Sequence, residues 1–426
     1  MPARQAVSVV AIGSGLPPGM VIIRFARGLF SMLLLTACGG GGGDVVIPPF
    51  WSDAGLVVED LDGDGRVDVA LATTYITGPP AHAGYVHVFL QSSPGVFDAP
   101  AQYPIAPDPW GMSAGDFDGD GRPDLVVATP RIGPAQIDSI GDSGRISLLR
   151  QDPARPGHFL PALQADTGGS ATDAVIGPMS GDTLADVAVA DGVGVNARVL
   201  LLAQDPANPG SLLAPVSIPA GVSSEDMALA DVDGDGLPDI VLAGANGVAV
   251  LYQRTGGGFD AALPLPAGIE PWGVAVADVD GDGRTDIVVA NAGYAPKNGV
   301  GGGSVSVLRQ TSPGSFVASQ IPVADGPTRV AIADLNGDGI PDIVVNSLVF
   351  QAISEPARIT VLLQSATNRG QFAVAGVYEG PMVGIFVAAG DVNGDGLNDI
   401  VVNDGPSVLL QRADAPGSFS SLRPLR

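Results

Sequence analysis

The sequence predicts an all-β protein, a seven-bladed β-propeller of four-stranded antiparallel blades. Three observations lead to this prediction. First, 60 Gly and 37 Pro among 426 residues interrupt the chain too often for long helices. Second, one Asp- and Gly-rich motif of nine residues recurs along the chain. Third, short apolar runs typical of β-strands flank the copies of this motif.

The N-terminal segment has the features of an export signal in the expected order. Arg24 and Arg27 precede the apolar stretch 29–35, which is too short to span a bilayer as a mature helix. The tetrapeptide Leu35-Thr36-Ala37-Cys38 resembles the lipobox of bacterial lipoproteins. This resemblance implies cleavage before Cys38 and lipidation of its thiol. The alternative is that Cys38 is a buried free cysteine.

The chain is therefore expected to have three parts. Residues 1–37 are the signal peptide, with Met20 as an alternative start, residues 38–44 are the lipidated cysteine and a Gly-rich tether, and residues 45–426 are the propeller. We expect an outer-membrane lipoprotein that faces the periplasm or the cell exterior and meets the membrane only through its lipid. Because the sequence has one cysteine, no intramolecular disulfide can stabilise the exported fold, and a bound metal is one substitute.

The repeated motif is Asp-x-Asp/Asn-Gly-Asp-Gly-x-x-Asp, and we call each copy an Asp loop. Intact Asp loops begin at Asp60, Asp116, Asp231, Asp278, Asp334 and Asp391. A degenerate seventh copy occupies residues 178–186 and has Pro178 in place of the first carboxylate. We therefore expect no tightly bound ion in that copy.

The fifth unit illustrates the strands expected around each Asp loop. Residues 273–277 lead into the loop, residues 286–290 lead out of it, residues 304–310 form a third strand, and a fourth strand starts near Phe316. Seven such units describe a propeller, in which closure of the ring protects the sheet edges. A linear β-solenoid is the alternative, but its coils are shorter. The mode of closure stays open, because residues 45–50 either pair with the last blade or only precede the first.

A known family shares these features. Residues 276–290, Val-Ala-Asp-Val-Asp-Gly-Asp-Gly-Arg-Thr-Asp-Ile-Val-Val-Ala, resemble the FG-GAP/VCBS repeat family, to which the propellers of integrin α-subunits belong. The resemblance implies a propeller with calcium loops between the first and second strands of its blades.

The chemistry of the Asp loops also favours calcium. Carboxylates at positions 1, 3, 5 and 9 place hard oxygen ligands around one centre, and position 7 can offer its backbone carbonyl. Because the residue twelfth in the loop from Asp60 is Leu71 and no bidentate Glu, we assign the bidentate role to the Asp at position 9. Oxygen-only ligation disfavours zinc and copper, and magnesium requires stricter octahedral geometry. The alternative is that Asp and Gly only form turns.

About six Ca²⁺ ions are expected, one for each intact loop and mainly structural. Their predicted ligands are Asp60, Asp62, Asp64, Arg66 and Asp68; Asp116, Asp118, Asp120, Arg122 and Asp124; Asp231, Asp233, Asp235, Leu237 and Asp239; Asp278, Asp280, Asp282, Arg284 and Asp286; Asp334, Asn336, Asp338, Ile340 and Asp342; and Asp391, Asn393, Asp395, Leu397 and Asp399.

The charge balance limits the possible partners. With 45 acidic against 20 basic residues, the protein repels nucleic acid and anionic lipid surfaces, so neither is an expected partner. We expect a monomer that binds a protein or a glycan.

The expected binding surface is the face opposite the Asp loops, where the longer loops 75–84, 130–144, 292–303 and 347–357 gather. Trp110 and Trp272 each precede an Asp loop by six residues and are candidates for stacking on a sugar or anchoring a protein. The alternative is simple packing at the start of a strand.

Two other functions remain open from the sequence. One is a carbohydrate-active enzyme, a polysaccharide lyase or hydrolase that uses groups at the centre of the propeller. The other is a passive envelope scaffold. Catalysis has little support, because none of the three histidines lies in a metal or triad motif.

Overall fold

The computed structural model describes residues 20–23, 33–36, 50–76, 82–130, 144–191, 197–293, 302–323, 326–348, 356–381, 384–403 and 405–425. Every named element in this part is a β-strand. Within the described part, no helix is long and apolar enough to cross a membrane. The predicted lipidation site Cys38 lies outside the described residues.

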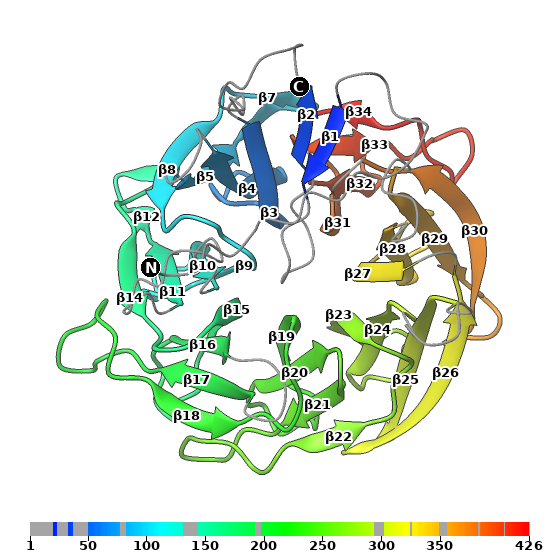
Figure 1. Cartoon of the computed structure of the whole chain (residues 1–426). Coiled ribbons are helices and arrows are strands. Elements are labelled where there is room, and N and C mark those ends of the chain that lie inside the picture. The colour runs from blue at the N-terminus through cyan, green and yellow to red at the C-terminus, as the bar shows by residue number, and fades with distance from the viewer. Residues whose placement is uncertain are drawn as a thin grey trace, which may run out of the picture.

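Seven four-stranded antiparallel sheets form a ring about a central axis, with the first strand of each sheet innermost (Figure 1). This confirms the predicted seven-bladed β-propeller. The first four blades are β3 (Phe50–Glu59), β4 (Asp68–Ile76), β5 (His82–Phe89) and β8 (Ala101–Ile105); β9 (Met112–Gly115), β10 (Asp124–Thr129), β11 (Arg145–Leu149) and β14 (Leu163–Asp166); β15 (Ala171–Gly177), β16 (Asp186–Asp191), β17 (Arg198–Leu202) and β18 (Val216–Pro219); and β19 (Asp226–Ala230), β20 (Asp239–Gly244), β21 (Gly247–Leu251) and β22 (Leu263–Leu265).

The remaining three blades have the same order. They are β23 (Pro271–Ala277), β24 (Asp286–Asn291), β25 (Ser304–Ser312) and β26 (Ser315–Pro322); β27 (Gly326–Ala333), β28 (Asp342–Leu348), β29 (Arg358–Gln364) and β30 (Phe372–Glu379); and β31 (Val387–Gly390), β32 (Asp399–Val402), β33 (Ser407–Leu409) and β34 (Arg423–Pro424). Three small hairpins lie outside the blades: β1 (Met20–Ile23) with β2 (Leu33–Thr36), β6 (Gln91–Ser93) with β7 (Val96–Phe97), and β12 (Gln151–Asp152) with β13 (Arg155–Phe159).

The core lies between neighbouring blades, and the strand sequences reflect this. The second strands of blades 2 to 7, such as β20 with the sequence DIVLAG, are buried at every position, because a blade packs on each of their faces. Each fully buried Val, Leu or Ile contributes about 1.5–3 kcal/mol to stability. The outermost strands are largely exposed instead, and β26 shows only two half-buried positions.

Among the described residues, the ring closes by packing of the first blade against the last, and no strand of one blade pairs in the other. The last blade consists of β31 to β34, and Phe50 pairs with Ile76 inside the first blade. Across the seam, Val69 of the first blade packs in one cluster with Val392 and Val408 of the last blade. The structure therefore decides the alternative left open for Phe50 in favour of the first blade.

One position of the first strands connects blades near the central axis. It lies five residues before the start of each Asp loop or its degenerate copy and is occupied by Gly55, Gly111, Asp173, Asp226, Gly273, Arg329 and Phe386. Asp173 Oδ2 accepts a hydrogen bond from Met227 N (2.9 Å), and Asp226 Oδ2 accepts one from Val274 N (2.8 Å). These bonds connect blade 3 to blade 4 and blade 4 to blade 5.

Candidate metal centres

Each Asp loop is a tight turn held by its own first residue. In blade 1, Asp60 Oδ1 accepts hydrogen bonds from Gly63 N (2.8 Å) and Asp64 N (3.1 Å), and Oδ2 accepts one from Gly65 N (2.8 Å). Gly63 and Gly65 have φ values of 77° and 85°, which residues with a Cβ adopt at a cost. The motif therefore needs Asp at position 1 and Gly at positions 4 and 6 for the turn itself.

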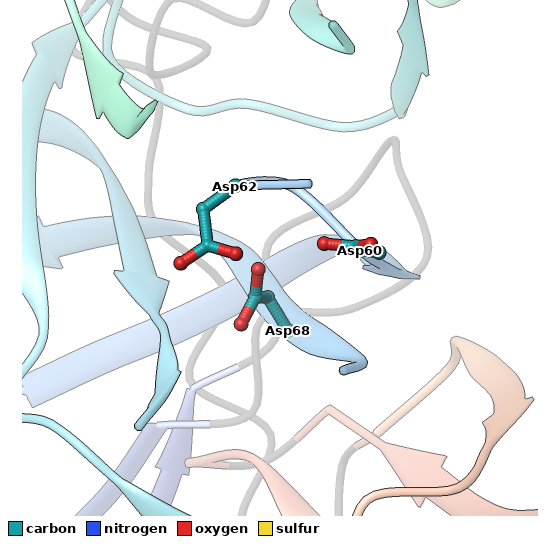
Figure 2. A group of neighbouring side chains, drawn as sticks. All are labelled: Asp60, Asp62 and Asp68. Atoms are coloured by element: carbon teal, nitrogen blue, oxygen red, sulfur yellow. The ribbon is translucent and has the colours of Figure 1, made fainter. Parts of the chain in front are cut away.

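The turn brings carboxylates together. Ligand atoms of Asp60, Asp62 and Asp68 lie within 4.8 Å of one another, and Figure 2 shows these side chains converging from the loop and the start of β4. The equivalent clusters are Asp116, Asp118 and Asp124 in blade 2, and Asp231, Asp233 and Asp239 in blade 4; blade 5 clusters Asp278, Asp280 and Asp282. These four groups could hold metal ions.

The Asp at position 9 is buried and has two roles. Asp68 is 0% exposed, its Oδ2 accepts a bond from Leu61 N (2.9 Å), and its Oδ1 accepts one from Gln91 N (2.7 Å). Both oxygens therefore accept hydrogen bonds from the main chain. If Asp68 also binds an ion in bidentate fashion, each oxygen must contact the ion and a backbone N–H at the same time. Position 9 still belongs to the carboxylate clusters of blades 1, 2 and 4.

Burial also perturbs the position-9 carboxylates. It raises the pKa of Asp68 to about 6, although the bonds from Gln91 and Leu61 oppose the shift. Burial likewise raises the pKa of Asp124, Asp239, Asp286 and Asp342 to about 6 and that of Asp399 to about 7. A low-dielectric site disfavours the negative charge, and a bound cation compensates for this cost.

Positions 5 and 7 divide the loops into two groups. In blades 1, 2 and 5 an Arg at position 7 forms an ion pair with the Asp at position 5: Arg66 with Asp64, Arg122 with Asp120, and Arg284 with Asp282. In blades 4, 6 and 7 position 7 is Leu237, Ile340 and Leu397. In the first group the Arg side chain therefore neutralises the position-5 carboxylate. The backbone carbonyl of the same Arg can still act as the predicted metal ligand.

The loops of blades 6 and 7 replace the position-3 carboxylate by an amide. Asn336 Oδ1 accepts a bond from Asp338 N (2.9 Å), and Asn393 Oδ1 accepts one from Asp395 N (2.9 Å). Asp62 Oδ1 accepts the corresponding bond from Asp64 N (3.1 Å) in blade 1. Asn therefore preserves the turn and a neutral oxygen ligand while removing one charge.

The degenerate copy in blade 3 keeps the carboxylates of positions 5 and 9 but lacks those of positions 1 and 3, and Thr183 replaces the position-6 Gly. Asp186 Oδ2 accepts bonds from Met179 N (2.8 Å) and Ser180 N (2.6 Å), as position 9 does elsewhere. Ser180 Oγ donates to Asp182 Oδ1 (3.2 Å), so a neutral hydroxyl faces the remaining carboxylate. Among the described residues, no group of three acids forms at this copy.

The donor set fits a hard divalent cation. All side-chain ligands at the clusters are carboxylate oxygens, with amide oxygens in blades 6 and 7. In blade 5 the Oδ1 atom of Asp280 is buried and has no hydrogen-bond donor among the described residues. Asp280 Oδ2 pairs with Arg309 Nη1 (3.3 Å), so Oδ1, beside two further carboxylates, is the atom that a bound cation would stabilise.

Family models match these repeats. Residues 60–127, 179–242, 231–289 and 297–345 match the FG-GAP-like repeat, and residues 109–149 and 271–308 match the FG-GAP repeat. The matches cover more than half of the chain. The chain belongs to the FG-GAP repeat family. This FG-GAP protein is 41% identical to human integrin alpha-IIb over 75 residues, which are 16% of this chain and 7% of that relative.

Solved structures resemble this FG-GAP protein at low identity. The rhamnogalacturonan lyase YesX is 13% identical with a TM-score of 0.48, and 88% of this chain and 72% of that chain are covered. A rhamnogalacturonan lyase of Bacillus licheniformis is 14% identical with a TM-score of 0.46, and 94% of this chain and 78% of that chain are covered. The biofilm matrix protein Bap1 of V. cholerae is 14% identical with a TM-score of 0.44, and 87% of this chain and 80% of that chain are covered. These values support no inference about activity or ligands.

A repeated glutamine is a feature of this FG-GAP protein that the loop motif did not reveal. At or just after the end of each third strand, or within it in blade 5, lies one buried Gln whose backbone N donates to the position-9 Asp of its blade. These residues are Gln91, Gln151, Gln204, Gln253, Gln310, Gln364 and Gln411. The available signal was Leu-x-Gln, or Phe-x-Gln in blade 1, at the end of every third strand.

The two candidate tryptophans of this FG-GAP protein lie on the face opposite the Asp loops, at the start of a first strand whose other end is the loop. Both are half-buried. Trp110 N donates to Ala128 O (2.8 Å), while its indole Nε1 is buried without a partner among the described residues. The carbonyl of Trp272 accepts a bond from Arg329 Nη1 (3.3 Å). Most of the longer loops predicted for this face, within 75–84, 130–144, 292–303 and 347–357, lie outside the described residues.

Proposed function

We propose that this protein is a calcium-stabilised binding propeller of the cell envelope, non-enzymatic, in which the ions are mainly structural. The observation that carries the proposal is the convergence of three carboxylates within 4.8 Å in the loops of blades 1, 2, 4 and 5. The carboxylates within such a cluster repel one another unless a cation is bound. The position of the loops, between the inner first and second strands, suits ions that hold the blades together.

Calcium suits these loops better than other common metals. It accepts six to eight oxygen ligands with flexible geometry, whereas magnesium requires a strict octahedron and zinc prefers nitrogen or sulfur. The side chains at positions 1, 3, 5 and 9 and the carbonyl at position 7 would hold it. When bound, the ion supplies the positive charge that the buried carboxylates lack. The proposal assigns six ions, one for each intact Asp loop.

Metal analysis and thermal unfolding test this proposal. A purified chain starting at Asp44 should contain about six Ca²⁺ per molecule by elemental analysis. Removal of calcium with EGTA should lower Tm by more than about 10 °C, since the ions bind the folded state only. Magnesium added to the chelated protein is the control and should restore less than half of the loss. An unchanged Tm after complete metal removal would refute the structural role.

We also propose that a protein or glycan partner binds on the face opposite the Asp loops. The support is the half-buried position of Trp110 and Trp272 at that end of the inner strands and the length of the loops there. The soluble domain should bind in glycan arrays or pull-down experiments, and Trp110→Ala with Trp272→Ala should abolish binding while the calcium-dependent Tm is preserved. Turnover of a polysaccharide would instead identify a carbohydrate-active enzyme, and a complete lack of partners would favour a passive scaffold.

The cell-envelope location rests on the N-terminal sequence. Cleavage before Cys38 and lipidation would leave a monomeric propeller on a Gly-rich tether. Metabolic labelling with a fatty acid should mark the wild-type protein and not Cys38→Ser, which should be found in the soluble fraction. Protease treatment of whole cells would then distinguish surface exposure from a periplasmic orientation.

A further inference from the structure

Six of the seven repeated glutamines connect the Asp loops, or the degenerate copy, of two neighbouring blades. In blade 2, Gln151 Nε2 donates to Pro123 O (2.7 Å), next to its own loop, and to Leu61 O (2.6 Å) in the loop of blade 1. Its Oε1 accepts a bond from Gly157 N (2.9 Å). Gln151 is 1% exposed, so its amide is fully used inside the protein.

This amide completes a chain of hydrogen bonds between two candidate metal ligands. Leu61, whose carbonyl accepts the Gln151 bond, donates its backbone N–H to Asp68 Oδ2 (2.9 Å). At the other end, Gln151 N donates to Asp124 Oδ1 (2.7 Å). The position-9 carboxylates of blades 1 and 2 are therefore connected through two residues, Gln151 with its backbone N–H and side-chain amide, and Leu61 with its N–H and C=O.

Similar bridges recur around the ring. The further Nε2 donors and their acceptors in the preceding blade are Gln204 to Phe117 O (2.9 Å), Gln253 to Pro178 O (3.2 Å), Gln310 to Val232 O (2.7 Å), Gln411 to Leu335 O, and Gln91 to Val392 O (2.9 Å) across the seam. Except at Gln253, the acceptor residue is at position 2 of the loop. Position 2 is apolar and at most 2% exposed in these loops, so the peptide is held rigidly between the blades.

One glutamine departs from this pattern. Gln364 N donates to Asp342 Oδ1 (2.7 Å), Nε2 donates to Pro341 O (2.6 Å) and Oε1 accepts a bond from Gly370 N (2.6 Å). Among the described residues, Gln364 has no hydrogen bond to the loop of blade 5. The structure thus contains a matched internal control, with the same residue type and a similar burial but without the bridge.

We infer that the bridging glutamines are positioning residues that couple ion binding in neighbouring Asp loops. This inference rests on the proposed calcium function. An ion that binds the position-9 Asp of one loop fixes the orientation of that carboxylate. The carboxylate in turn orders the glutamine whose backbone N–H is bonded to it. The side-chain amide of that glutamine then holds the carbonyl of the position-2 residue in the preceding loop, and the N–H of the same residue orients the next position-9 Asp. Because the path is buried and fully hydrogen-bonded, the first ion prepares the neighbouring site.

The loop of blade 4 offers a local probe for this coupling. Tyr252 precedes Gln253, its hydroxyl is buried, and the charges of Asp239 and Asp233 contribute to the rise of its pKa, so it lies near the cluster. Terbium luminescence excited through Tyr252 therefore reports on ion binding at this site. The luminescence that remains in Tyr252→Phe measures the contribution of all other sites and is subtracted. Gln310 provides the bridge from blade 5 to Val232 in this loop.

The experiment measures terbium affinity at the blade 4 site. Asp282→Asn, which weakens the loop of blade 5, should lower the affinity about fivefold in the wild-type background, at the lower end of typical coupling. In a Gln310→Met background the affinity should start lower, and Asp282→Asn should change it no further. In a Gln364→Met background the full coupling should remain. Both Gln variants should lower the Tm of the metal-free protein, so a loss of stability alone does not explain a loss of coupling.

A second comparison needs no glutamine substitution. Asp282→Asn should affect the blade 4 site, whereas Asp338→Asn in blade 6, beyond the junction without a bridge, should leave it unchanged. Equal effects of Asp282→Asn and Asp338→Asn on the blade 4 site would overturn the inference that glutamines couple the sites. Coupling that persists in Gln310→Met would overturn it as well, and neither result would argue against calcium binding. A wild-type protein that binds neither terbium nor calcium would overturn the proposed function and the coupling together.

Discussion

Arg329 of β27 reaches past blade 5 to Asp226 of β19, with Nε 3.7 Å from Oδ2. Its guanidinium also donates to Trp272 O (3.3 Å) and Glu225 O (3.0 Å) and lies over the ring of Phe386, 4.7 Å from its centroid. The equivalent position of blade 5 is Gly273. A Cβ there would lie 2.6 Å from Thr328 O and 2.8 Å from Arg329 Cα, so glycine is required for the inner strand of blade 6 to pack this closely.

Loss of this arginine should destabilise the protein strongly. Arg329 is 5% exposed, and Arg329→Met would leave Asp226 and the nearby Glu225 without their counter-charge. Breaking a buried ion pair costs about 3–5 kcal/mol. The free energy of unfolding in urea, measured with calcium present, should fall by that amount.

Arg145→Met is the matched control for this prediction. The pair of Arg145 and Asp166 is 2.7 Å apart, but the side chains are 45% and 63% exposed. An exposed pair contributes at most about 1 kcal/mol. Equal losses for the two variants would show that the central ion pair is energetically unimportant.

The carboxyl next to this ion pair should make stability depend on pH. Burial raises the pKa of Asp173 well above its ordinary value, and the charge of Asp226 raises it further, while Arg329 opposes the rise. A side-chain hydrogen bond with Asp173 opposes the rise in the pKa of Asp226, and a protonated Asp173 would be its donor. A raised folded-state pKa contributes stability that is complete below the unfolded pKa of 3.8 and is lost as the pH rises through the folded value.

Asp173→Asn removes this titration and tests its sign. The Tm of the wild type minus that of Asp173→Asn should fall as the pH rises above the unfolded pKa of 3.8 in saturating calcium. The comparison cancels the effects of the Asp loops, which titrate equally in both proteins. A difference that stays constant or grows with pH would show that Asp173 is ionised in the folded protein.

Glycines in the chain should differ in their tolerance to alanine for distinct reasons. Gly65 has a φ of 85°, but a Cβ there meets no atom within 4 Å, so Gly65→Ala should cost only the left-handed strain of about 1–2 kcal/mol. In β5, a Cβ at Gly84 would lie 2.1 Å from Ala106 O, so Gly84→Ala must displace a neighbouring backbone. Urea unfolding should show the larger loss for Gly84→Ala.

The degenerate loop of blade 3 should be repairable. Pro178 removes the first carboxylate and Ser180 the second, whereas Asp182 and Asp186 remain in place. Thr183 also replaces the position-6 Gly that the turn requires. Pro178→Asp, Ser180→Asp and Thr183→Gly together should therefore raise the bound calcium by one ion per molecule in elemental analysis. Pro178→Ala, Ser180→Ala and Thr183→Gly together are the control and should leave the stoichiometry unchanged. An unchanged stoichiometry in the Asp variant would show that the turn of blade 3 cannot hold an ion.

The sequence by itself determined the repeat, the strands around it and the Asp loop, because these depend on neighbouring residues. The bonds from Gly63 N and Gly65 N to Asp60 all fall within one nine-residue motif, so turn chemistry was readable without a structure. Apolar runs of strand length on both sides of each loop then required blades. The family of the chain follows from the same local pattern.

Only the tertiary structure decided how the blades hold one another. Arg329 and Glu225 are 104 residues apart, and Gln151 lies 90 residues from Leu61, so no local pattern relates them. The closure of the ring by packing of the first blade against the last, and the sharing of each position-9 Asp between the loop and the third strand, likewise depend on distant segments. These contacts form because burial between blades leaves each polar group with no water, and each must find a partner in another blade.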